Sequence, residues 1–146
     1  MENQSGFLVE LYKANKYVEE MIQKVWNDLH INHVELLIIK LACSEEPTVT
    51  YIANELLITK SAASQAVQKL LDKGLISKYP SKDNKKSFYI KSTSKAKELF
   101  KEIIMLYQEK IKEFQEKLGK EEFLMFYSLT SRFNQVMKNI KREDKC

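Results

Sequence analysis

The first part of the chain carries an apolar stripe at helical spacing. Between residues 7 and 29, the positions Leu8, Leu11, Val18 and Ile22 are separated by steps of three, four or seven residues. Such steps place apolar side chains on one face of an α-helix. The pattern therefore predicts a long amphipathic helix over residues 7–29.

Two short helices are expected next. Asn32 is placed to cap a helix over residues 33–43, which is apolar nearly all round and therefore belongs in the centre of the fold. A polar break follows at residues 44–47. After it, Thr48 is placed to cap a second short helix that runs through Leu57.

A third short helix, over residues 60–72, has two different faces. Thr59 is placed to cap it, and Gly74 is placed to end it in the left-handed conformation. Its inner face is predicted to be small and apolar, with Ala63, Ala66, Val67, Leu70 and Leu71. Its outer face is rich in short polar groups that both donate and accept hydrogen bonds. That outer face is therefore suited to touching a partner.

After Gly74 the apolar residues recur at every second position, and from Thr93 they again recur at helical spacing. Residues 75–79 and 87–91 alternate as strands do, and the turn-forming residues 80–84 join them into a hairpin with a basic tip. A long helix then runs from Thr93 until Gly119 interrupts it, and a final helix follows. The chain is therefore expected to be mainly α, an α+β winged helix.

The predicted organisation is a single domain over residues 1–146. A winged helix-turn-helix lobe occupies residues 32–92, and N- and C-terminal dimerisation helices occupy residues 5–30 and 93–142. The lobe can shield only part of the apolar stripes on the terminal helices, so we expect them to bury the rest against a second copy. A monomer that folds these helices back on itself is the alternative.

Charge is concentrated in one quarter of the chain. Residues 60–97 hold ten lysines against Asp72 and Asp83, whereas the remaining residues carry a net charge of −4. A positive field over one region attracts a polyanion better than the same net charge spread evenly. Nucleic acid is therefore the leading candidate partner.

Composition argues against several other classes of function. Only three glycines occur, which excludes a glycine-rich phosphate-binding loop. The N-terminus does not read as a signal peptide, and no apolar run approaches membrane-spanning length, so we expect a cytoplasmic protein with no membrane partner. The two cysteines, Cys43 and Cys146, match a reducing compartment. Cys43 is expected to be a structural thiol, because the apolar helix around it would blunt its reactivity.

Several short segments match motifs of a known protein family and follow one another in the same order. Thr48, Ile52 and Ala53 match a Thr-x-x-x-Leu-Ala segment, residues 61–64 and 70–74 match the next helix and its ending, and Ser92, Thr93 and Ala96 take the places of a Leu-Thr-x-x-Gly segment. In these segments and in the order of its parts, essentially the whole chain resembles the MarR family, the bacterial multiple-antibiotic-resistance-type regulators. The resemblance implies a dimeric winged-helix transcription regulator, usually a repressor, often released by a small ligand or by oxidation.

The hairpin departs from the family pattern. The family usually carries Asp-x-Arg just before the second strand, where this chain has Asn84, Lys85 and Lys86, with Asp83 one residue early. The aspartate that normally braces the wing is therefore displaced or replaced. Lysine lacks the planar fork of arginine, so Lys86 suits a phosphate better than a narrow minor groove.

The third short helix and the hairpin supply the candidate DNA contacts. If that helix enters a major groove, Gln65 can pair with adenine and Ala62 can contact a thymine methyl, which predicts an A·T-rich operator. The expected base-reading residues are Ser61, Ala62, Ser64, Gln65 and Gln68. The expected phosphate contacts, which orient the protein without reading sequence, are Lys60, Lys69, Lys82, Lys85, Lys86 and Lys91. The plainer alternative is a solvated helix face with solubilising charges.

Other candidate sites are weaker. Tyr12, Met21, Trp26 and Tyr107 are candidates for an effector pocket, although such residues are more often core. His30 and His33 lie near Asp28 and Glu35, but no further His or Cys cluster completes a ligand set, so we expect no metal and no cofactor.

The sequence thus predicts a homodimeric, sequence-specific regulator of transcription that binds double-stranded DNA, acts as a repressor, and is open to relief by a small-molecule effector. The alternative is a winged helix used as a protein-interaction module. An enzyme is not expected, because no nucleophile, acid–base pair or metal cluster with credible spacing is visible.

Overall fold

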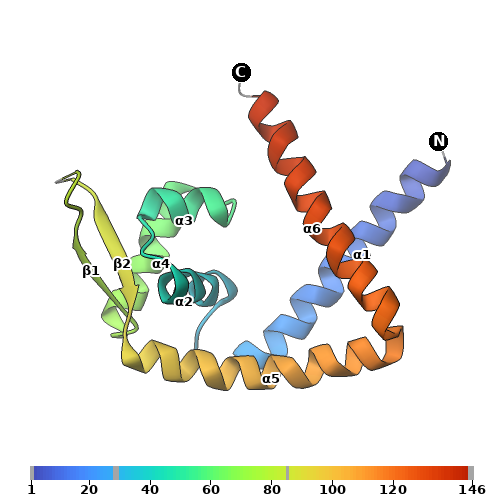
Figure 1. Cartoon of the computed structure of the whole chain (residues 1–146), viewed down its shortest axis with the longest axis horizontal. Helices are drawn as coiled ribbons and strands as arrows, with labels where there is room; N and C mark the ends of the chain where they lie inside the picture. Colours follow the sequence, from blue (N-terminus) through green and yellow to red (C-terminus); the bar gives the residue numbers. More distant parts are fainter. Residues whose placement is uncertain (1, 28–29, 85, 145–146) are drawn as a thin grey trace. The chain divides into compact units, whose positions relative to one another are not determined.

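The computed structural model describes residues 2–27, 30–84 and 86–144 (Figure 1). The elements follow in the order α1 (Glu2–Trp26), α2 (His33–Ser44), α3 (Val49–Glu55), α4 (Lys60–Asp72), β1 (Ile76–Pro80), β2 (Phe88–Ser92), α5 (Ser94–Leu118) and α6 (Lys120–Glu143). They form two compact units, Met1–Leu106 and Tyr107–Cys146. The predicted winged helix, mainly α with one hairpin, is confirmed.

The core of the first unit lies around α2. Its side chains Ile38 and Ile39 are fully buried, and they share the core with Ile52 of α3, Leu70 of α4 and Ile90 of β2. The central position predicted for this apolar helix is confirmed. Since the inner face of α4 is small, with Ala63 and Ala66 buried among larger residues, that helix can pack closely and leave its other face outward.

The three predicted N-caps are all present. The Asn32 side chain accepts a hydrogen bond from the backbone amide of Glu35, and the Glu35 carboxylate accepts one from the backbone amide of Asn32, which completes a capping box. Thr48 accepts from the amide of Tyr51, and Thr59 accepts from the amide of Ala62. These bonds satisfy amides that the first turn of each helix leaves without partners.

The end of α3 differs from the prediction. The helix stops at Glu55 rather than at Leu57, which takes a left-handed conformation with φ of 57° and is 71% exposed. The amide of Ile58 then bonds back to the carbonyl of Ala53, as in a Schellman ending. Glycine usually occupies the left-handed position of this motif, so a leucine at this position does not signal the end of a helix.

The hairpin is shifted by one residue from the expected strands. The predicted glycine stop is confirmed, because Gly74 has φ of 69° and the amide of Leu75 bonds back to the carbonyl of Leu70. This bond holds Leu75 in the helix ending, so β1 begins one residue later, at Ile76. The strands are antiparallel, with Ile76 opposite Ser92 and Pro80 opposite Phe88.

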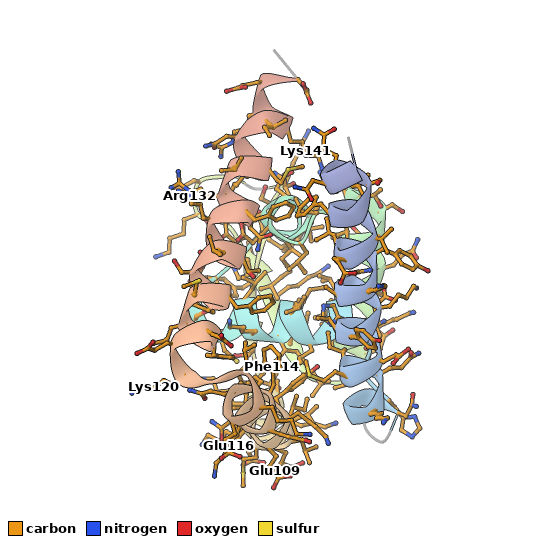
Figure 2. The ribbon with its side chains drawn as sticks, turned by 90° about the vertical axis from the view of Figure 1, so that its right-hand side faces the viewer. Glu109, Phe114, Glu116, Lys120, Arg132 and Lys141 are labelled. Atoms are coloured by element: carbon orange, nitrogen blue, oxygen red, sulfur yellow. The ribbon has the colours of Figure 1, made fainter. Side chains whose placement is uncertain are left out.

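The second unit consists of the end of α5 and the whole of α6. Gly119, with φ of 98°, separates the two helices as the sequence predicts. The ring of Phe114, which is labelled in Figure 2, lies 5.9 Å from the rings of Phe123 and Phe126, so the turn is held by aromatic contacts. None of the described residues of α6 is buried within the chain.

A buried ion pair joins α2 to the end of α4. The Glu35 side chain is 3% exposed, and its carboxylate accepts a hydrogen bond of 3.0 Å from the Lys73 Nζ. The same ammonium donates to the carbonyl of His30 at 2.7 Å, and Asn32 Nδ2 donates to the other Glu35 oxygen. One lysine of the basic quarter is therefore engaged inside the fold.

We expect Lys73→Ala to lower the free energy of unfolding by about 1–3 kcal/mol, because the substitution leaves a buried carboxylate without its cation. Urea denaturation measures this change. Lys13→Ala is the matched control, since Lys13 also forms an ion pair, 2.9 Å from Glu10, but on an exposed helix face where such pairs contribute little. Equal losses in the two variants would contradict a structural role for burial at Glu35.

Candidate nucleic-acid interface

A groove of about 290 Å³ runs between α4, the start of α3 and the hairpin. The α4 side contributes Lys60, Ser64 and Gln68, and the hairpin contributes Lys78, Lys86 and Phe88. None of the described residues that line the groove is acidic. The groove therefore combines a polar helix face with uncompensated positive charge.

The five predicted base-reading residues lie together on the exposed side of α4, namely Ser61, Ala62, Ser64, Gln65 and Gln68. Two of their amides bond within the helix: Gln65 Nε2 donates to Ser61 Oγ at 3.4 Å, and Gln68 Nε2 donates to Asp72 Oδ1 at 2.9 Å. Both bonds are exposed, so they can be exchanged for bonds to a ligand at little cost.

The six lysines predicted to contact phosphates are spread over several places. Lys60 and Lys86 line the groove, and Lys82 is exposed at the hairpin tip. Lys69 is exposed near the end of α4 and lines a different groove. Lys85 lies outside the described residues.

Lys91 lies on the other face of the hairpin. It follows the buried Ile90 in β2, and neighbouring residues of a strand point to opposite faces. Its Nζ is 3.8 Å from Glu46 Oε1. The structure thus does not bring Lys91 together with Lys60 and Lys86.

The structure adds two residues to the groove that the sequence did not single out. Lys78 Nζ lies 4.7 Å from the centroid of the Phe88 ring, in the geometry of a cation–π contact. The register of the hairpin places both on the face that carries Ile90. Alternation along each strand was the available signal, but without the register it does not pair Lys78 with Phe88.

The turn of the hairpin is braced by polar side chains other than aspartate. The buried Ser81 Oγ accepts hydrogen bonds from the amides of Asp83 and Asn84. Asn84 Oδ1 accepts from the amide of Lys86 at 3.1 Å. Ser81 and Asn84 thus hold the turn in this chain, although the sequence had pointed only to a displaced or replaced aspartate.

A second, wider groove of about 890 Å³ lies in the first unit beside the ion pair of Glu35 and Lys73. Its lining is largely polar, including Asn15, Gln23 and His30. Of the residues predicted for an effector pocket, Tyr12 is exposed and Met21 half-buried on α1, and neither lines this groove. Tyr107 belongs to the second unit, and the Trp26 side chain lies outside the described residues.

Histidine and cysteine positions carry little chemistry in the structure. Burial lowers the pKa of His33, and the described residues contain no group of three or more His, Cys, Asp or Glu side chains arranged to hold a metal. Cys43 was expected to be a structural thiol shielded by the apolar helix around it, but its side chain is exposed on α2, so the helix does not shield it. Cys146 and Asp28 lie outside the described residues.

No helix among the described residues is long and apolar enough to span a membrane.

The chain is similar to known proteins both in part of its sequence and in its fold. Residues 31–88 match the model of the MarR family. A MarR protein from Peptoclostridium difficile DA00132 has a similar structure, with 19% identity and a TM-score of 0.80 over 91% of this chain and 88% of that chain. An uncharacterised SlyA-like transcription regulator from Listeria monocytogenes has 18% identity and a TM-score of 0.78 over 90% and 89% of the two chains.

NadR, solved in complex with 4-hydroxyphenylacetate, has 20% identity and a TM-score of 0.75 over 86% of this chain and 89% of that chain. No curated protein sequence matches the chain significantly. The resemblance seen in the sequence is therefore confirmed: residues 31–88 match the MarR family model, and the chain shares a winged-helix fold with solved transcription regulators along nearly its whole length.

Proposed function

We propose that the chain is a cytoplasmic regulator of transcription that binds a double-stranded DNA operator in a sequence-specific way, as a homodimer and as a repressor. The observation that carries the proposal is the groove between α4 and the hairpin, where a polar helix face is flanked by Lys60, Lys78 and Lys86 without an acidic residue in the described lining. A DNA backbone supplies the negative charge that such a surface lacks.

The outer face of α4 supports base reading. Small side chains at Ser61, Ala62 and Ser64 let the helix approach closely, and a major groove is wide enough to admit one helix. Gln65 and Gln68 are exposed and carry the paired donor and acceptor that an adenine edge requires. The lysines of the groove would then orient the helix through phosphates.

Exposed apolar surface on the terminal helices supports the homodimer. On α6, Phe126, Leu129, Phe133, Val136 and Ile140 are all exposed within one chain and recur at steps of three and four. Exposed stripes of this kind mark interaction surfaces. A second copy is the occupant we propose, because two copies related by symmetry would present two α4 helices to the two halves of an operator.

The repressor role and relief by a small molecule rest on the family resemblance and on NadR, which was solved with 4-hydroxyphenylacetate. An effector would release the operator if it bound more tightly to a form in which the two α4 helices no longer match successive grooves. Tyr12, Met21, Trp26 and Tyr107 remain the proposed effector contacts.

We expect the purified protein to bind duplex DNA with an affinity that falls steeply as salt rises, and Gln65→Ala to change the preferred sequence in a binding-site selection. Loss of one bidentate pair with adenine removes about 1–3 kcal/mol of discrimination per half-site. The matched control is Gln108→Ala, which removes the same side chain from an exposed position of α5. Binding that is indifferent to salt would instead favour the protein-interaction module.

The variants Lys86→Ala and Lys91→Ala test whether the two faces of the hairpin differ in their contact with DNA. We expect Lys86→Ala to weaken binding to all duplexes alike and to reduce the slope of log affinity against log salt by about one per half-site. We expect Lys91→Ala to leave that slope unchanged, because Lys91 lies on the opposite face beside Glu46. An equal reduction in both variants would show that both faces meet phosphate.

Phe133→Asp tests the dimer. A charge placed within the apolar stripe of α6 would be desolvated at an interface between copies, so we expect the variant to be monomeric at micromolar concentration by light scattering. Gln135→Asp adds the same charge to an exposed position outside the stripe and should leave the dimer intact. A monomeric parent protein would refute the proposed assembly.

A further inference from the structure

Lys78 and Phe88 form a diagonal pair on the groove face of the hairpin. Lys78 stands opposite Ile90 and Phe88 stands opposite Pro80, so the two side chains are offset by one pair along the same face. The Phe88 ring is 40% exposed, and the Lys78 ammonium lies 4.7 Å from its centroid. Both residues line the groove beside α4.

The ring is the contact that orients this ammonium. The face of an aromatic ring attracts a cation, and the described lining of the groove offers Lys78 no carboxylate. Lys91 on the opposite face is different, because Glu46 lies near it. The charge of Lys78 is therefore held in place without being neutralised, and it stays available for an anion.

We propose that Phe88 is a positioning residue for DNA binding. It holds the Lys78 ammonium toward the groove, where Lys78 contacts a backbone phosphate that flanks the base pairs read by α4. A lysine side chain normally loses much rotamer freedom when it binds a phosphate, and a chain already seated on a ring loses less. This inference rests on the proposed function.

The contact itself is tested in the free protein. In the parent labelled with ¹³C at lysine Cε, one resonance should be shifted upfield by the ring, and it should be missing from the spectrum of Lys78→Ala. The shift should be lost in Phe88→Leu and kept in Phe88→Tyr, which retains an aromatic face. A Lys78 resonance at the position of the other lysines would overturn the proposal.

The role in binding is tested by a double-mutant cycle on duplex DNA. We expect Phe88→Leu to weaken binding about two- to fivefold per half-site while leaving the salt slope unchanged, because Lys78 keeps its charge. In the Lys78→Ala background, Phe88→Leu should have no effect. Phe88→Tyr should bind like the parent.

Lys60→Ala is the matched control for the cycle, because Lys60 lines the same groove from α4. Its effect and that of Phe88→Leu should be additive. If Phe88→Leu weakened binding equally in the parent and in Lys78→Ala, the ring would act on DNA or on the fold, and the proposed positioning would be refuted. A parent that keeps the ring-shifted lysine but ignores duplex DNA would refute the proposed function, and with it this role.

Discussion

The short helices of the first unit depend on the satisfaction of backbone groups at their ends. Asn32, Thr48 and Thr59 each accept an amide at a helix start, and left-handed residues at Leu57 and Gly74 let later amides bond back at the helix ends. These stops fix where each helix begins and ends. Within those bounds, packing against the core buries the alanine face of α4 and leaves its serine and glutamine face turned outward.

The strands of the hairpin also divide their side chains between an inner and an outer face, because neighbouring residues of a strand point to opposite sides. One face carries Ile90 into the core, and the same face carries Lys78, opposite Ile90, and Phe88, nearer the tip, along the groove. The opposite face carries Lys91 beside Glu46. A run of lysines that looks uniform in the sequence is therefore divided by the pleat into a face that meets α4 and a face turned away from it.

Much of the fold could be predicted because the signals were local. Caps, a glycine stop and a change of apolar period each act within a few residues, and they located the helices and strands from α2 onward to within two residues. The first helix, predicted over residues 7–29 from its apolar stripe alone, instead spans Glu2–Trp26, because no cap or stop marked its ends. What the sequence could not supply was pairing across distance. The ion pair of Lys73 with Glu35 and the cation–π contact of Lys78 with Phe88 both depend on which segments lie side by side. The exposure of Cys43 was missed for a related reason: an apolar helix still has an outward side, and only packing decides which residue occupies it.

No described residue of α6 is fully buried within one chain, so the order of this helix depends on what covers its apolar stripe. Apart from the contacts of Phe123 and Phe126 with Phe114, this 24-residue helix is held mainly by its own backbone hydrogen bonds, which give only marginal order in water. In the dimer proposed above, unassembled copies would fray at this segment and present it to proteases, whereas paired copies would be protected. With the proposed dimer, turnover of the protein would then fall as its concentration rises.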